Sequence, residues 1–81
     1  MSERLSYMGR LREKELEQRR LVIKAEGLRD SIRQALDPFE KIEIIRADVA
    51  AEQAVELADL VIQIVALNGE IAAIRRALGK E

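Results

Sequence analysis

Apolar side chains recur with a seven-residue period through the second half of the chain. They alternate at intervals of three and four residues in one row: Leu57, Leu60, Ile64, Leu67, Ile71, Ile74 and Leu78. This spacing places them on one face of an α-helix, and a repeat held this long is typical of a left-handed coiled-coil seam. The sequence therefore predicts a long helix that packs lengthwise against a second helix.

A second apolar row lies beside the first on the same predicted helix. It consists of Ala54, Ala58, Val61, Val65 and Ala72. A single neighbouring helix covers a seam of about two positions in seven. Because the two rows together are broader than that, the pattern predicts that this helix contacts more than one neighbour.

The first half of the chain has a matching but shorter row. Its members are Leu21, Ala25, Leu28, Ile32 and Ala35, again at alternating intervals of four and three residues. From Arg10 to Arg20, however, only Leu11 and Leu16 are apolar, and eight of the eleven residues are charged. We therefore expect the first helix to begin with a solvated arm, up to about residue 20, that packs weakly.

The connection between the helices centres on Asp37 and Pro38. Proline disfavours helical geometry in the residue before it, so the first helix should end near residue 36. Asp37 can then cap a short turn of helix over about 38–45, with Glu40 at the position of a capping-box acid. Asp48 is the expected cap of the main second helix, and Leu78 with Gly79 its expected end.

These boundaries predict an all-α fold of a single domain, residues 1–81. The first helix spans about 3–36, the connection about 37–47 and the second helix about 48–78. Two long helices of equal length with a short connection favour an antiparallel, coiled-coil-like helical hairpin. Glycines inside the helices, Gly27 and Gly69, indicate either ordinary tolerated positions or close helix approach.

A hairpin alone would leave one apolar row of the second helix in water. We therefore expect self-association into a homodimeric four-helix bundle, because large exposed aliphatic side chains each forgo roughly 1.5–3 kcal/mol of burial. The residues expected to carry it are Leu57, Leu60, Val61, Ile64, Val65, Leu67, Ile71 and Ile74.

The composition offers little chemistry. The chain has no cysteine and no histidine, so thiol nucleophiles, zinc sites and the usual general base of neutral pH are missing. Carboxylates such as Glu52, Glu56 and Asp59 belong to a polar helix face, and Ser31 is expected to be an exposed helical residue. We predict no enzymatic activity and no cofactor or metal. No signal peptide or membrane span is recognised, which makes the cytoplasm the expected location.

Charge is segregated along the chain, although the net charge is only −1. In a hairpin, basic residues gather at the open end and acidic residues at the hinge. Three interpretations remain open: a solvated surface, head-to-tail pairing of two hairpins, and an anionic partner. The last would make the chain a nucleic-acid-associated protein. The possible contact residues for such a partner are Arg4, Arg10, Arg12, Arg75 and Arg76, with Lys80 nearby.

The preferred hypothesis is a non-enzymatic interaction or scaffold protein, with an unidentified protein as its partner. Nucleic-acid binding is the alternative. Against it, the chain is slightly acidic and has no aromatic residues interleaved with the arginines for base stacking.

Overall fold

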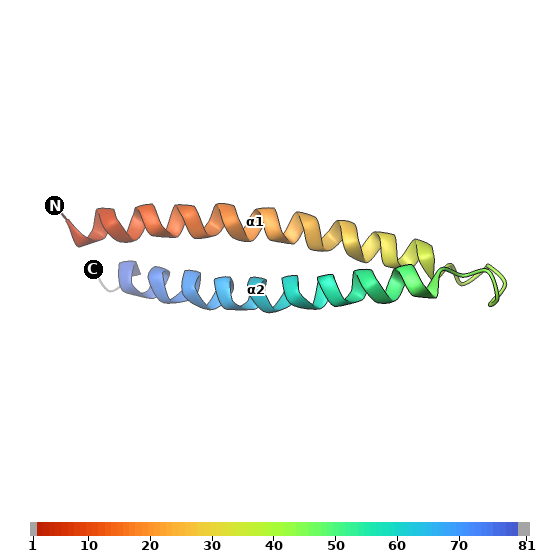
Figure 1. Ribbon diagram of the computed structural model, residues 1–81. Helices are drawn as coiled ribbons and strands as arrows, with labels where there is room; N and C mark the ends of the chain where they lie inside the picture. Colours follow the sequence, from red (N-terminus) through yellow and green to blue (C-terminus); the bar gives the residue numbers. More distant parts are fainter. Residues whose placement is uncertain (1, 80–81) are drawn as a thin grey trace.

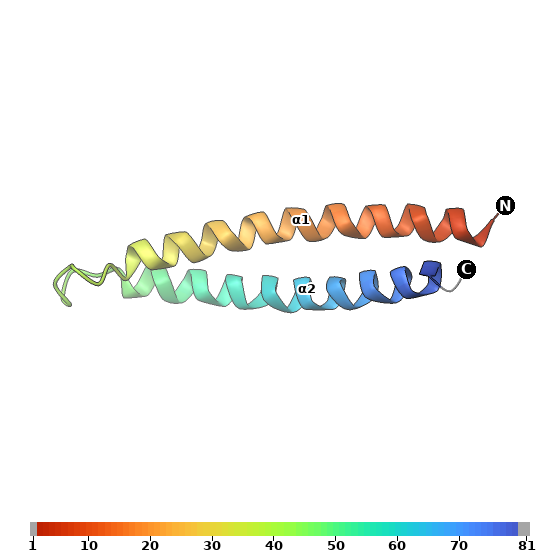
Figure 2. The same ribbon diagram turned by 180° about the vertical axis from the view of Figure 1, so that it is seen from behind.

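The computed structural model describes residues 2–79, and it is an antiparallel hairpin of two helices (Figure 1). Helix α1 spans Glu3–Ala35 and helix α2 spans Ala47–Gly79, each with 33 residues. The described chain contains no strand. The molecule is a rod of 62 × 18 × 15 Å, and the start of α1 and the end of α2 lie at the same end of the rod, as the reverse view also shows (Figure 2). The predicted all-α hairpin is confirmed.

The seam between the helices is built from the predicted seven-residue row of α2. This row, extended by Ala50 and Gln53 at the hinge end, is buried or half-buried throughout. On α1, Leu21 is the one buried residue among those described, and Ala25, Leu28 and Ile32 are half-buried around it. Burying each large aliphatic side chain contributes roughly 1.5–3 kcal/mol, so these positions hold the hairpin together.

Local interactions at each end explain where helix α1 begins and ends. The Ser2 hydroxyl accepts a hydrogen bond from the backbone N–H of Arg4 at 3.1 Å, which caps the first turn. At the other end, the Leu36 N–H donates to the carbonyl of Ile32 at 3.0 Å. Pro38 follows and lacks the N–H that another helical turn would need.

The connection contains two separate turns, so the predicted short helix over 38–45 is wrong. The Glu40 N–H donates to the Asp37 carbonyl at 3.2 Å, and the Ile44 N–H donates to the Lys41 carbonyl at 3.0 Å. Asp37 does cap, because its Oδ1 accepts from the Phe39 N–H at 2.9 Å, but it caps the first turn rather than a helix. The Glu40 carboxylate accepts from the Lys41 N–H instead of reaching back to Asp37.

The physical reason is the geometry of chain reversal. The Arg46 N–H donates to the Ala35 carbonyl at 3.0 Å, and this hydrogen bond holds the two ends of the connection together. A segment whose ends meet must turn back on itself, and a continuous helix over most of its length would keep them apart.

Helix α2 begins one residue earlier than predicted. The Arg46 carbonyl accepts the first helical hydrogen bond, from the Ala50 N–H at 3.0 Å, so Arg46 takes the cap position and Asp48 lies inside the first turn. A hydrogen bond from the Val49 N–H, with help from Arg46, lowers the pKa of Asp48. At the other end α2 extends to Gly79, close to the expected end at Leu78 and Gly79, and the φ of Gly79 is not positive.

The helical glycines do not mark close approach of α1 to α2. A Cβ atom added at Gly27 or at Gly69 would meet nothing within 4 Å. Within one hairpin, both positions therefore face open space.

Candidate functional site

The structure places most of the predicted self-association residues inside the hairpin itself. Leu60, Ile71 and Ile74 are buried in the seam with α1. Leu57, Ile64 and Leu67 are half-buried in the same seam. Only Val61 and Val65 of the eight remain exposed, at 47% and 63%. The second row, which contains Val61 and Val65, therefore faces outward. The seven-residue row from Leu57 to Leu78 faces α1 instead.

The exposed apolar surface is wider than the sequence analysis indicated, since Val55 and Ile62 belong to it and were missed. They are 74% and 68% exposed, more than either Val61 or Val65. Both follow the spacing of four and three residues that signals a helix face, which could have revealed them. We define the outer face of α2 as Ala51, Val55, Ala58, Ile62, Val65, Gly69 and Ala72, flanked by Ala54 and Val61.

The hairpin exposes more surface than a compact protein of its size. Its accessible area is 6303 Å² for a mass of 9.2 kDa. A compact monomer of this mass averages about 4,900 Å², so the excess is roughly 1,400 Å². A standard protein interface covers about 800 Å² on each partner. The hairpin thus has enough surplus surface for one such interface.

Ion pairs across the seam fix how the two helices are aligned. Lys14 lies 2.5 Å from Glu70, Arg75 2.6 Å from Glu15, and Lys24 3.5 Å from Glu56. All six side chains are partly exposed, so each pair contributes at most about 1 kcal/mol. These charged pairs lie along the edges of the seam and leave the outer face of α2 uncharged over its length.

The predicted basic residues meet at the open end of the rod, but several already have partners within the chain. Arg4 donates from Nη1 to the carbonyl of Leu78 at 3.3 Å. Arg75 pairs with Glu15, and the Arg10 guanidinium lies 5.6 Å from the centre of the Tyr7 ring. Arg4 and Arg75 therefore link the two helices at the open end, whereas the Arg10 contact lies within α1.

The other basic side chains do not share one face. Arg10 and Arg12 flank the half-buried Leu11 on either side, and successive helical residues are rotated by about 100°, so the two arginines project to opposite sides of α1. Arg12 and Arg76 are exposed, and neither pairs with an acidic residue in the described part of the chain. Lys80 lies outside the described residues.

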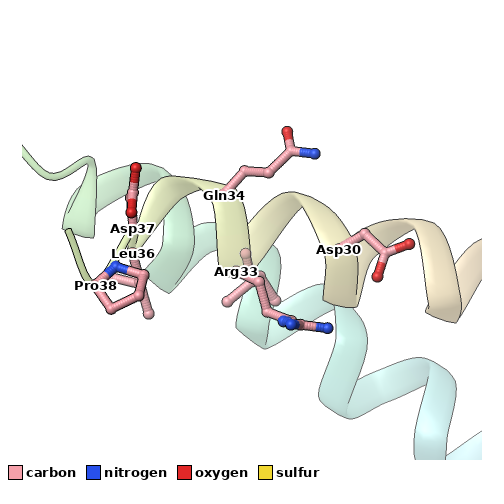
Figure 3. A pocket seen from close by; sticks show the side chains of 7 residues that line it. Asp30, Arg33, Gln34, Leu36, Asp37 and Pro38 are labelled. Carbon is pink, nitrogen blue, oxygen red and sulfur yellow. The ribbon is translucent and has the colours of Figure 1, made fainter. Parts of the chain in front are cut away.

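The hollows of the surface do not bring reactive groups together. The larger, of about 780 Å³, lies at the end of α1 and is lined by Asp30, Ile32, Arg33, Gln34, Leu36, Asp37 and Pro38. Figure 3 shows Asp30 and Gln34 extending in different directions from α1 rather than toward one another. The smaller, of about 320 Å³, surrounds the Glu15–Arg75 pair. Within residues 2–79, no group of three acidic residues could hold a metal ion.

The connection carries the most exposed large side chains. Phe39 is 96% exposed and Ile42 is 80% exposed. Acidic residues alternate with them along the chain, in the order Asp37, Phe39, Glu40, Ile42 and Glu43. The connection extends beyond the ends of both helices (Figure 1), so these side chains lie at the hinge end of the rod.

Helix α2 also meets the length and composition criteria for a membrane span, although the sequence analysis expected none. Its most apolar stretch has a mean hydropathy of 1.7, and 17% of that stretch is buried in the hairpin. The longest uncharged stretch of α2, residues 60–69, is too short to cross a membrane, but a longer stretch that includes two charges at most has the required mean hydropathy. A core helix of a water-soluble protein meets the same criteria but is mostly buried, whereas this stretch of α2 is mostly exposed in a single hairpin.

Comparison with protein-family models, with curated proteins and with solved structures finds no match to this chain.

Proposed function

We propose that this chain is a non-enzymatic interaction protein that pairs with a second copy of itself through the outer face of α2, giving a four-helix assembly. The observation that carries the proposal is the exposure of Val55, Ile62 and Val65, at 74%, 68% and 63%, on one continuous apolar face. Contiguous exposed apolar surface of this kind is typical of protein interfaces. The excess accessible area supports the same conclusion, because one standard interface would remove about half of it.

Packing energetics also favour pairing. Each of these aliphatic side chains gains roughly 1.5–3 kcal/mol when it leaves water. A domain of this size has a net stability of only several kcal/mol. Burial of the outer face would therefore add a free energy comparable to the whole net stability. Pairing through α2 gives this helix neighbours on both of its apolar sides, as its two rows require.

A protein surface explains the outer face better than a lipid bilayer. Helix α1 packs along the whole of α2, and it carries nine basic and six acidic side chains between residues 3 and 35. Placing α2 across a membrane would either bring these charges into the hydrocarbon region or separate the two helices. Each charge at the centre of a bilayer costs at least about 2.5 kcal/mol.

Matched substitutions test the proposal. Val65→Asp places a charge on the outer face of α2, and Ile23→Asp places one on α1 at a residue that is 67% exposed, compared with 63% for Val65. We expect Val65→Asp to abolish association, measured by sedimentation, and Ile23→Asp to leave it unchanged. Equal effects of the two substitutions would refute the outer face of α2 as the interface.

Nucleic-acid binding stays the alternative, because the start of α1 and the end of α2 meet at one end of the hairpin and carry Arg4, Arg10, Arg12, Arg75 and Arg76. Titration with duplex DNA at low and at high salt separates it from the preferred function, since phosphate contacts weaken steeply with salt. Salt-sensitive binding that disappears in Arg12→Ala with Arg76→Ala would favour the alternative.

A further inference from the structure

Five residues of α2 lie on one line of the outer face and its extensions. Asp48, Val55, Ile62, Gly69 and Arg76 follow one another at intervals of seven residues. Seven residues fall about 20° short of two full turns, so neighbours in this line point in nearly the same direction, and the whole line winds around α2 in step with the seven-residue seam. All five are exposed in the hairpin.

The line has complementary ends. An acidic residue, Asp48, closes it at the hinge, and a basic residue, Arg76, closes it at the open end. Asp48 is paired only loosely, since its carboxylate lies 3.5 Å from Arg46 and is 74% exposed. Asp48 and Arg76 both lie fourteen residues from Ile62, the midpoint of the line.

The side-chain sizes on the two sides of Ile62 also complement each other. Val55 and Gly69 each lie seven residues from Ile62, so a large side chain on one side matches a residue without a side chain on the other. A Cβ at Gly69 meets nothing within the hairpin, which leaves space there for a side chain from outside.

These relationships distinguish the two orientations of a helix pair. In a parallel pair, Asp48 would lie beside Asp48 of the second copy, Arg76 beside Arg76, and Gly69 beside Gly69. In an antiparallel pair, Asp48 lies near Arg76 of the second copy at both ends, and Val55 lies near Gly69. Like charges across an interface are unfavourable, and opposite charges fix its register.

We infer that two hairpins pair antiparallel along the outer face of α2, about a two-fold axis near Ile62, with Arg76 of each copy facing Asp48 of the other. This inference rests on the proposed self-association and specifies its orientation. It also places each acidic hinge beside the basic open end of the other copy, so the opposite charges along the rod attract each other.

Because the protein has no cysteine, single-cysteine variants test the orientation directly. Val55→Cys and Gly69→Cys are prepared separately, mixed, treated with a short bifunctional maleimide and analysed by mass spectrometry. The antiparallel pair predicts a product that joins position 55 of one copy to position 69 of the other. It predicts little product that joins the two copies of position 55, because these are then roughly 21 Å apart along the axis. A parallel pair predicts the reverse.

The outcomes separate the two proposals. Linkage between the two copies of position 55 in a dimer would overturn the orientation and leave the outer face as the interface. Absence of both products would overturn the orientation as well. A chain that sediments as a monomer would overturn the self-association itself.

A charge exchange provides an independent test. Asp48→Arg and Arg76→Glu should each weaken association by roughly tenfold, since two exposed ion pairs turn into two repulsive contacts. The double variant should regain most of the lost affinity. Each substitution also opposes the helix dipole, so effects within one chain would make the double variant weaker than either single variant. Failure of the double variant to recover would therefore overturn the inference.

Discussion

The Gln53 side chain donates a hydrogen bond from Nε2 to the Ser31 hydroxyl oxygen at 2.8 Å, across the seam between α2 and α1. Ser31 is half-buried, so the expectation of an exposed helical residue was wrong. The other polar atom of Gln53, Oε1, is buried and has no hydrogen-bond partner among residues 2–79. A buried polar atom without a partner costs stability.

Replacing Gln53 by leucine should stabilise the hairpin. Gln53→Leu removes the unpaired oxygen and continues the apolar seam, and we expect the free energy of unfolding to rise by about 1 kcal/mol. Ser31→Ala should lower it by about 1 kcal/mol, because it leaves the Gln53 amide with no partner at all. Urea titrations followed by circular dichroism measure both. A decrease in stability for Gln53→Leu would contradict this account of the seam.

Hydrogen exchange should be uneven along the rod. In the arm, α1 meets α2 through Tyr7, Leu11, Lys14 and Gln18, all half-buried and mostly polar, whereas Leu21 begins the apolar seam. The arm buries fewer apolar side chains of its own than the rest of α1, although Ile71 and Ile74 of α2 are buried beside it, and this implies lower local stability. We expect fast backbone exchange up to about residue 20 and slow exchange from Leu57 to Ile74. Uniform protection of both segments would show that the arm is held by contacts outside one hairpin.

The two central glycines should respond differently to alanine. Gly27→Ala should raise the free energy of unfolding by about 1 kcal/mol, because alanine has the higher helix propensity and nothing obstructs its Cβ. Gly69→Ala gains the same helix propensity, but in the proposed assembly its Cβ would lie in the interface with the second copy. We therefore expect a smaller gain for Gly69→Ala, measured by thermal unfolding at equal protein concentration. Equal gains would argue that Gly69 faces solvent in the assembly.

Acid should weaken the start of α2 through Asp48. The Val49 N–H and Arg46 hold the pKa of Asp48 below its ordinary value. A carboxyl whose pKa is lowered by folding stabilises the protein above its unfolded pKa of about 3.9, and this contribution is lost as the pH falls through the folded pKa.

The Asp48→Asn variant should therefore lose less stability than the original protein between neutral and strongly acidic pH. Thermal unfolding across this range measures the difference. Glu52→Gln, which removes one carboxylate a turn further on, is the matched control. An unchanged acid response in Asp48→Asn would show that the hydrogen bond to Asp48 does not contribute.

The fold could be predicted from the sequence because its signals are local and redundant. The Leu57–Leu78 row, the position of Pro38 and the matching row from Leu21 to Ala35 all indicate two helices that pack against each other. Their spacing alone determines which residues share a face, and the structure confirms that these rows form the seam.

The candidate site could be predicted only in part, because it depends on which row α1 covers. Both rows of α2 are apolar, and which row α1 covers depends on packing between residues far apart in the sequence, with ion pairs such as Glu15–Arg75 and Lys14–Glu70 along the edges of that seam. The two turns of the connection likewise depend on the Arg46–Ala35 hydrogen bond, which joins residues that a local pattern does not relate. Val55 and Ile62 follow a helical spacing that the sequence shows, but their exposure became apparent only once the seam was known.

Sedimentation equilibrium of the unmodified protein at micromolar concentration tests the central claim most directly, with helicity followed by circular dichroism on the same samples. The self-associating hairpin predicts a mass near twice 9.2 kDa, which falls on dilution together with helicity. A mass of 9.2 kDa with full helicity at the same concentrations would contradict the account, since the outer face of α2 would then be stable in water without a partner.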